Sequence, residues 1–364
     1  GFLLLIVAPV LGPFAAPLAW LTDTSLGICG WMVEASLRLP GASFFVADIP
    51  EWWLWIYVVG LLAALWVSMP TIGVRVLAGV GGVWLALGLA IGFGFGRDLA
   101  PRIAFLAVGH GGCTVIQTSA GRTLVYDAGS MAGPDVTRRV IAPYLWSRGV
   151  RRIDELYISH ADLDHFSGVP SLLDRFAVDR ISMTPSFAGR EVETVAVVMA
   201  ELRRRNVPTR VVKFGDSETW DDVRLDVLHP PSRGPEGKEN VRSLVLHVRM
   251  GTLKTLLTGD LEGEGLERVL AMRPPELDVL MAPHHGSPLA NIAPLAAWAR
   301  PTIAIGCAGR PRSVRSPAPV YAAVGAEYLS TYDEGAVIVR VIGGAWTALT
   351  YRSAKSFRLT AAGR

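Results

Sequence analysis

The segment SHADLDHFSG, residues Ser159 to Gly168, places two histidines and two aspartates within six consecutive positions. These residues are His160, Asp162, Asp164 and His165, and each offers a nitrogen or oxygen donor suited to a divalent cation. The segment follows a run that reads as a buried strand ending at the first histidine. His160 and Asp162 can point to one side of such a loop while Asp164 and His165 reach another. A solvated acidic loop is the alternative, but a pair of divalent cations better explains the density of donors.

Two later segments supply further donors at the ends of strand-like runs. Asp260 follows LKTLLTG, where a carboxylate could bridge two cations, serve as the N-cap of a helix starting near Glu262, or do both. His284 and His285 follow LDVLMAP and precede Gly286, which permits a tight turn. Since the chain has only seven histidines, two adjacent ones after an apolar strand are a specific signal.

Around these segments, the sequence from Arg102 onward alternates between short strand-like and helix-like runs. Two sheets with helices on their outer faces, a four-layer α/β sandwich, accommodate this order. The expected strands are 103–108, 113–118, 123–129, 152–160, 180–184, 209–213, 224–229, 243–249, 254–259, 278–282, 302–306, 326–330 and 336–342. The expected helices are 135–148, 168–176, 192–205, 262–270, 290–298 and 316–324.

The first 96 residues have a different composition, with six charged side chains and seven of the eleven tryptophans. Residues 2–21, 52–69 and 76–95 are each apolar enough to be expected as membrane spans, and residues 25–40 as an amphipathic interfacial helix. A signal peptide at 2–21 fits less well, because no basic region precedes it and two apolar spans follow. We therefore expect a fragment of a longer multi-pass membrane protein, with a membrane segment at 1–98, a soluble domain at 102–352 and a tail at 353–364.

Charge and cysteine content exclude several classes of protein. The net charge is +3, without a basic run long enough to indicate nucleic-acid binding by itself. Cys29, Cys113 and Cys307 are too few and too widely spaced for a disulfide framework or a CxxC metal site. Arg75 favours a cytoplasmic loop between the last two spans, which places the soluble domain outside the cytoplasm. Arg97 and Arg102, just beyond the last span, favour the opposite orientation.

The motifs of the soluble half resemble those of the metallo-β-lactamase superfamily, whose signature is HxHxDH; here it reads H-A-D-L-D-H. That aspartate variant, together with LAVGHGGCTVIQT, TLVYDAGS, RSLVLHV, LLTGD and APHHGS, resembles the C-terminal domain of ComEC-type competence proteins. The resemblance implies an αββα four-layer sandwich. It also implies an inner-membrane channel for DNA uptake in natural transformation.

The resemblance assigns roles to particular residues. It makes the four donors of the opening segment cation ligands and Asp260 the bridging carboxylate. One of His284 and His285 would complete the second cation site and the other would face the substrate. Asp127, in YDAGS, would be a buried structural aspartate beneath the loop. The expected catalytic residues are therefore Asp164, His284 and His285.

Three departures from the family pattern bear on activity. Ala107, His110 and Gly112 stand where relatives usually carry Asp, Gln and Asp, so His110 is expected as a compensating ligand, a substrate contact or an ordinary loop residue. The third ligand of the first cation is open between Asn240 and a water, because RSPAP at 315–319 replaces a further His-Pro. Asn240 is also a candidate substrate contact. His229 and His247 lie in apolar strands and are expected in the core.

The resulting hypothesis is a metal-dependent phosphodiesterase or nuclease that degrades the DNA strand that is not imported. Its cofactors would be two Zn²⁺ or Mn²⁺ ions. Its partners would be DNA, the bilayer of the inner membrane and other proteins of the uptake machinery. One alternative is a membrane-tethered hydrolase of another phosphodiester, such as a wall polymer or phospholipid. A second is a decayed domain that only shapes the channel. Asp162 argues against a true β-lactamase.

Overall fold

The structure, a computed structural model, describes residues 12–37, 51–66, 74–92, 99–309 and 316–360. Residues 2–11 of the first expected span, Arg97 and Arg315 lie outside these ranges. The chain divides into two compact units, residues 1–46 and 47–364, which are described separately. The second unit contains all the predicted cation donors.

The first sheet of the larger unit has nine strands, in the order β18-β17-β16-β1-β2-β3-β5-β7-β8. β3, β5, β7 and β8 run parallel to one another, and the other neighbours in the sheet are antiparallel. Its strands are β1 (Arg102–Phe105), β2 (Thr114–Gln117), β3 (Thr123–Tyr126), β5 (Glu155–Ile158), β7 (Ile181–Met183), β8 (Thr209–Val211), β16 (Val337–Ile342), β17 (Ala345–Thr350) and β18 (Ser356–Thr360).

The second sheet has seven strands, in the order β15-β14-β13-β12-β11-β10-β9. β12, β13, β14 and β15 are parallel, and β9 to β12 form an antiparallel meander. Its strands are β9 (Ser217–Trp220), β10 (Val223–His229), β11 (Val245–Met250), β12 (Leu253–Leu257), β13 (Val279–Met281), β14 (Ile303–Gly306) and β15 (Glu327–Ser330). Two short strands, β4 (Arg152–Ile153) and β6 (Ala177–Val178), pair separately.

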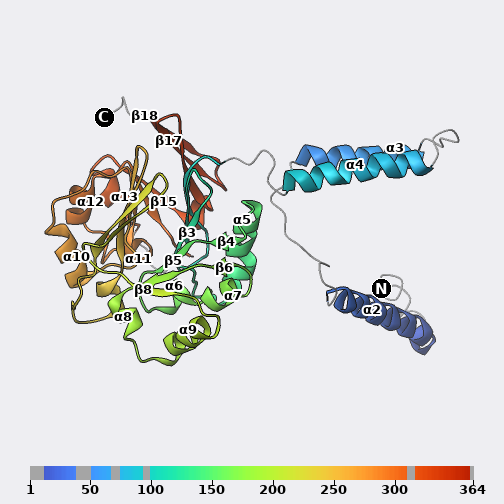
Figure 1. The fold of residues 1–364 in the computed structure, drawn as a ribbon, viewed down its shortest axis with the longest axis horizontal. Coiled ribbons are helices and arrows are strands. Elements are labelled where there is room, and N and C mark those ends of the chain that lie inside the picture. The colour runs from blue at the N-terminus through green and yellow to red at the C-terminus, as the bar shows by residue number, and fades with distance from the viewer. Residues whose placement is uncertain (1–11, 38–50, 67–73, 93–98, 310–315, 361–364) are drawn as a thin grey trace. The chain divides into compact units, whose positions relative to one another are not determined.

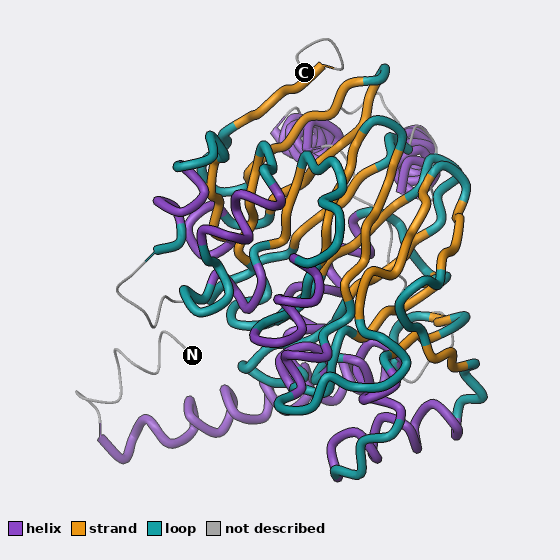
Figure 2. The backbone as a smooth tube through the Cα atoms, turned by 90° about the vertical axis from the view of Figure 1, so that its left-hand side faces the viewer, coloured by secondary structure: helices purple, strands orange, loops and turns teal. Residues whose placement is uncertain are grey.

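Side chains alternate between the two faces of a strand, so each sheet faces two different cores. In β1, Ile103 and Phe105 lie in the core between the sheets, whereas Ala104 faces an outer core. Helices close both outer cores, with α5, α7 and α9 on the first sheet and α10, α12 and α13 on the second (Figures 1 and 2). These helices are α5 (Ala142–Ser147), α7 (Val169–Leu173), α9 (Glu193–Arg204), α10 (Gly263–Leu270), α12 (Ala293–Ala299) and α13 (Ala318–Ala322). The expected αββα four-layer sandwich is therefore confirmed.

Short helical turns occupy the connections around the sheet ends. They are η2 (Thr137–Ile141), α6 (Leu163–Phe166), α8 (Pro185–Ala188), η3 (Glu239–Arg242), α11 (Pro283–Gly286) and α14 (Thr331–Glu334). α6 contains Asp164 and His165, and α11 contains His284 and His285, so these two turns carry four of the predicted donors.

The boundary expected at residue 352 is wrong, because the first sheet continues beyond it. β18 pairs with β17 over five residues, although Ser356–Thr360 was expected in a tail. β18 is an edge strand that carries Arg358, and charged residues on an edge strand limit pairing with other chains.

The described residues of the apolar N-terminal region form a short 3₁₀ turn, η1 (Gly12–Ala15), and three longer helices. α2 (Ala16–Leu37) is continuous across the expected break between residues 21 and 25, which corrects that division. Pro17 stands at its second position, where a missing N–H does no harm, and Thr22 and Ser25 bond back to the helix carbonyls of Leu18 and Leu21.

α3 (Glu51–Trp66) and α4 (Val74–Gly92) contact each other through aromatic rings in the larger unit. The Trp53 ring stacks on that of Trp84, with centroids 5.6 Å apart. Gly88 lies against the Trp53 ring, where an added Cβ would be only 2.3 Å from a ring carbon. Among the described residues, no helix combines the length and the apolar character that crossing a membrane requires.

Candidate metal centre

The parallel strands of both sheets deliver the predicted donors to one region. Asp127 follows β3, and His160 follows the neighbouring β5, while Asp260 and His284 follow β12 and β13. The Leu244 N–H donates to the carbonyl of Ser159, so a main-chain bond joins the two sheets beside the site. Residues separated by more than a hundred positions therefore meet at one edge of the sandwich.

Asp127 holds the loop that contains His160 to His165 through two contacts of its carboxylate. Its backbone has a φ of 61°, which an aspartate tolerates better than most residues. One carboxylate oxygen accepts from Ser159 N at 2.7 Å, and the other lies 2.8 Å from His165 Nδ1. The side chain is 1% exposed, and this pairing fixes the ring of His165 with its Nε2 directed into the site.

Four of the predicted donors form one buried cluster: Asp164, His165, Asp260 and His285. One ligand atom from each lies within 4.8 Å of all the others. His285 Nε2 is 3.1 Å from Asp164 Oδ2 and 3.2 Å from Asp260 Oδ2. His165 Nε2 is 3.1 Å from Asp260 Oδ1. Two ligands of a tetrahedral zinc ion lie about 3.3 Å apart for bonds of about 2.0 Å, so these separations suit a shared cation.

The hydrogen bonds of His285 define what the cluster needs. Its Nδ1 is 2.8 Å from the carbonyl oxygen of Cys307, which can only accept, so Nδ1 carries a proton. Its Nε2 then faces two carboxylates and needs either a second proton or a cation. The Nε2 atom of His160 is buried without a hydrogen-bond partner, and that of His165 is buried with the carboxylate of Asp260 as its neighbour. Two carboxylates and several imidazole nitrogens that converge in this way fit a divalent cation.

Without a cation, protons take its place and the charges in the cluster are strongly coupled. Burial lowers the pKa of His285, but the charge of Asp260 and a hydrogen bond with Asp164 outweigh it and raise that pKa to about 9. Burial raises the pKa of Asp164, but the hydrogen bond from His285 and the charge of His165 hold it at about 2. For Asp260, the charges of His285 and His165 outweigh burial and keep the pKa well below its usual range.

Cation binding is therefore expected to release a proton from His285. Since the raised pKa of about 9 keeps Nε2 protonated at neutral pH, this proton alone should make the affinity increase about tenfold per pH unit from pH 7 towards pH 9, and the proton of His165, whose pKa is also raised, should steepen the dependence. Calorimetric titration with Zn²⁺ in two buffers of different ionisation enthalpy measures the number of protons released. A His285→Ala variant should release one proton fewer, and an affinity independent of pH in this range would contradict the assignment.

The structure distinguishes the two adjacent histidines. His285 belongs to the buried cluster, whereas His284 is the more exposed and places its Nε2 3.8 Å from Asp260 Oδ2. The Nδ1 of His284 is 2.9 Å from Glu262 Oε2. Glu262 was missed as a functional residue in the sequence, although it lies only two residues after Asp260.

His160 and Asp162 lie close together but outside the cluster. His160 Nε2 is 3.6 Å from Asp162 Oδ2, and the His160 ring is 4.2 Å from that of His165. In the part of the chain that the structure describes, only the four-residue cluster gathers three or more His, Cys, Asp or Glu donors this tightly. The role of His160 and Asp162 at a first cation site stays a prediction.

His110 lies at the site. Its ring centroid is 4.3 Å from that of His285, and its Nε2 is 3.9 Å from Asp164 Oδ2. Gly112 leaves the cluster intact, because its main chain lies over the Asp127–His165 pair, where an added Cβ would be only 3.1 Å from His165 Nδ1. The absence of a carboxylate at residue 112 is therefore compatible with the arrangement of the four donors.

The other predicted polar residues surround the site at a greater remove. Asn240 is buried in η3, and its role as a substrate contact stays a prediction. Ser243, just after η3, accepts from Asp260 N through its hydroxyl at 3.2 Å and was missed in the sequence. His229 is buried, with Nδ1 2.9 Å from the carbonyl of Ser243, whereas His247 is only partly buried.

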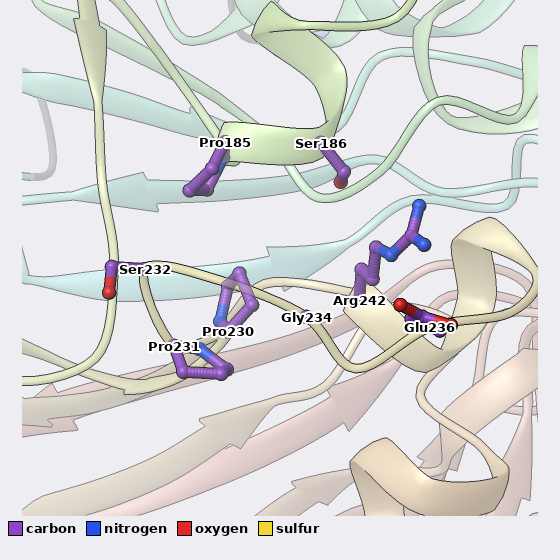
Figure 3. A pocket seen from close by; sticks show the side chains of 8 residues that line it. All are labelled: Pro185, Ser186, Pro230, Pro231, Ser232, Gly234, Glu236 and Arg242. Carbon is purple, nitrogen blue, oxygen red and sulfur yellow. The ribbon is translucent and has the colours of Figure 1, made fainter.

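A pocket of about 300 Å³ lies between α8 and the segment that leads into η3 (Figure 3). Pro185 and Ser186 face Arg242 and Glu236 across it, and Arg242 immediately precedes Ser243. A second hollow, of about 440 Å³, shares Pro185, Ser186 and Arg242 and extends to Arg190. Arg190 and Arg242 both contact the buried carboxylate of Glu239, at 3.0 and 3.3 Å.

The chain is similar to several known proteins. The sequence profile described as "Metallo-beta-lactamase superfamily" matches residues 107–299. "ComE operon protein 3" of Bacillus subtilis (strain 168) is 35% identical over 150 residues, which cover 41% of this chain and 19% of that protein. "Competence protein ComA" of Neisseria gonorrhoeae is 29% identical over 307 residues, 82% of this chain and 39% of the relative. A crystal structure of "the metallo-beta-lactamase fold protein YhfI from Bacillus subtilis" has 12% identity and a TM-score of 0.44, over 66% of this chain and 98% of that one.

The chain thus spans less than half of the length of either curated relative. The match to the superfamily profile covers more than half of this chain. It includes the loop from His160 to His165 and the turn at His284. The chain belongs to the metallo-beta-lactamase superfamily, in which it is a relative of the ComEC-type competence proteins.

Proposed function

We propose that this chain is part of a DNA-uptake protein and that its sandwich domain hydrolyses phosphodiester bonds of the DNA strand that is not imported. The observation that carries this proposal is the buried cluster of Asp164, His165, Asp260 and His285 in a metallo-β-lactamase fold. Two relatives, named ComE operon protein 3 and Competence protein ComA, support a role in DNA uptake. Divalent cations, Zn²⁺ or Mn²⁺, would be held by these residues, with His160 and Asp162 at a second position.

When bound, such cations lower the pKa of water and offset the negative charge of a phosphodiester. The residues of the chain supply the rest of the site. Asp127 holds the ring of His165, and the carbonyl of Cys307 holds that of His285, so both imidazoles keep their orientation. His284, outside the buried cluster, would face the substrate with Nε2 and, when Nε2 also carries a proton, would donate that proton to the leaving oxygen.

The pockets beside η3 are compatible with an extended substrate. Arg190 and Arg242 line them, and guanidinium groups are common contacts of DNA phosphates. Their attachment to Glu239 fixes both side chains in place at the segment that leads to Ser243 and hence to Asp260.

We further propose that residues 1–98 form the membrane segment, which would anchor the protein as a multi-pass protein of the inner membrane. Large apolar side chains lie exposed along all three long helices, among them Trp31, Trp55 and Val83. Exposed apolar surface on this scale is typical of contact with lipid or with other proteins. The soluble domain would then lie on the extracytoplasmic side.

The nuclease proposal predicts that Asp164→Ala reduces DNA hydrolysis by the purified full chain more than about a hundredfold. Loss of a residue that only supports a cation ligand typically costs about 10- to 100-fold, and loss of the ligand itself should cost more. The assay uses single-stranded and double-stranded DNA with Mn²⁺ or Zn²⁺. Asp174→Ala, at an exposed aspartate that pairs with Arg205, is the matched control and should keep full activity.

Two outcomes would redirect the proposal. Hydrolysis of a wall polymer or a phospholipid with no cleavage of DNA would keep the chemistry and change the substrate. A wild-type chain that neither binds a cation nor cleaves a phosphodiester, with transformation unaffected by Asp164→Ala in a competent host, would mean that the domain is a scaffold.

A further inference from the structure

We infer that Glu262 is a positioning residue that fixes the tautomer and the orientation of His284 in the site. This inference rests on the proposed function only for what His284 does to the substrate. The arrangement itself depends on contacts among the described residues. It assigns a functional role to a side chain whose position alone would make it a helix cap.

The first observation is that Glu262 does not act as the cap of its own helix. It occupies the N-cap position of α10 with an extended backbone, yet its side chain makes no capping hydrogen bond. Serine, threonine, aspartate and asparagine are the residues preferred for that task, and glutamate is not among them. Its Oε2 instead lies 2.9 Å from His284 Nδ1, across 22 residues of sequence.

The second observation is that the two adjacent histidines are held in the same way. His285 Nδ1 donates to the carbonyl of Cys307, and His284 Nδ1 donates to Glu262. Both Nε2 atoms then point toward the same oxygen, Asp260 Oδ2, at 3.2 and 3.8 Å. His285 has a main-chain carbonyl for this purpose, whereas His284 depends on a side chain that can be removed by substitution.

The third observation is the strain in the turn that presents these rings. His284 and His285 have φ values of 50° and 55°, and Gly286 follows at 83°. Left-handed backbone is unfavourable for a non-glycine residue, so two in succession persist only where other contacts hold them. The main chain is tied by His284 N to Gly259 O at 3.1 Å and by Ser287 N to His284 O at 2.8 Å. The imidazole of His284 is in turn held by Glu262.

A carboxylate that accepts from Nδ1 keeps the proton there and leaves Nε2 as the atom presented to the site. Without the carboxylate, the ring is free to rotate and to move its proton to Nε2, the tautomer that free imidazole prefers. Glu262 thereby determines which nitrogen of His284 meets the substrate or a cation.

The test is nitrogen NMR of the full chain labelled with ¹⁵N only in its seven histidines, at pH 8 and without added metal. Assignment of the His284 signals uses their loss in His284→Ala. The wild type should show His284 with the proton on Nδ1. Glu262→Ala should shift it to the Nε2–H tautomer, and Glu262→Gln, whose amide can either accept or donate, should give a mixture.

The matched control is Glu264→Ala, because Glu264 lies on the same helix and pairs only with exposed Arg268 in a contact of one helical turn. This variant should leave the His284 signals unchanged. An unchanged His284 tautomer in Glu262→Ala, or an equal shift in Glu264→Ala, overturns the inference. The volume-conserving Glu262→Gln keeps the test valid even if the alanine variant folds poorly.

Kinetics give a second reading. Loss of a carboxylate that orients a site histidine typically lowers activity about 10- to 100-fold, so Glu262→Ala should reduce kcat for DNA hydrolysis by that factor with KM nearly unchanged. A His284→Ala, Glu262→Ala double variant should be no slower than His284→Ala alone. If the wild type cleaves no phosphodiester, the proposed function fails, while the tautomer measurement still decides the role of Glu262.

Discussion

Asp260→Asn is expected to abolish cation binding at the buried cluster and, with it, all DNA hydrolysis. Its carboxylate lies beside three histidines, at 3.1 Å from His165, 3.2 Å from His285 and 3.8 Å from His284. Asparagine has the same size but no charge, so the imidazoles keep their places while the cation loses its central anion. Removing one partner from a buried charge pair costs about 3–5 kcal/mol, which corresponds to about two to three and a half orders of magnitude in affinity.

Metal content after dialysis and calorimetric titration with Zn²⁺ or Mn²⁺ measure this effect directly. Asp278→Asn is the matched control, because Asp278 is a buried aspartate in the same half of the domain that accepts from Lys254 N. That variant should lose some stability and keep its cations. Full cation binding by Asp260→Asn would show that the four donors do not form the site.

Asp127→Ala is expected to cause the largest loss of folding stability among the site residues. It leaves the Ser159 N–H and the Nδ1 of His165 without their acceptor in a fully buried position. Burial lowers the pKa of His165, but the charges of Asp260 and Asp127 outweigh it and raise that pKa well above the usual value. The imidazolium of the metal-free protein thus loses one of its two counter-charges. The expected cost is about 3–5 kcal/mol in the free energy of unfolding.

Urea unfolding of the metal-free protein, in the presence of a chelator, separates this effect from cation binding. Asp127→Asn should be milder, since asparagine keeps an acceptor and tolerates the positive φ of residue 127. Asp135→Ala, at an exposed residue that pairs with Arg138 and Arg139, should change stability by less than about 1 kcal/mol. Equal stability of Asp127→Ala and wild type would mean that the loop does not depend on this carboxylate.

The layers of the fold could be predicted from sequence because the core strands alternate so clearly. Ile103, Ala104 and Phe105 read as a strand and pack as one, with the two faces in different cores. The missed strands include β9 and β18, which are edge strands whose polar residues resemble those of loops, and β17, which lies between β16 and β18. Their pairing depends on partners far away in the chain, which local pattern does not reveal.

The cation donors could be identified from the sequence, but the different positions of His284 and His285 in the site could not. The turn at His284 and His285 is left-handed at both residues, which no local propensity favours. This backbone conformation directs the imidazole of His285 into the buried cluster and leaves that of His284 more exposed. Glu262 carried no signal beyond its nearness in sequence to Asp260, and Ser243 carried none beyond its place in the motif RSLVLHV. Two expectations from the sequence, the tail at 353–364 and the break in the first apolar helix, were wrong for want of the same long-range information.

The cluster draws Asp164 and His165 from loops of the first sheet, and Asp260 and His285 from the second, with Cys307 behind them. Domains emerge from the ribosome in order, beginning at the N-terminus. The last of the four donors, His285, is therefore made after the other three, and the carbonyl of Cys307 that holds its ring is made later still. A product that ends before β14 would contain all four donors but would lack the carbonyl that orients His285.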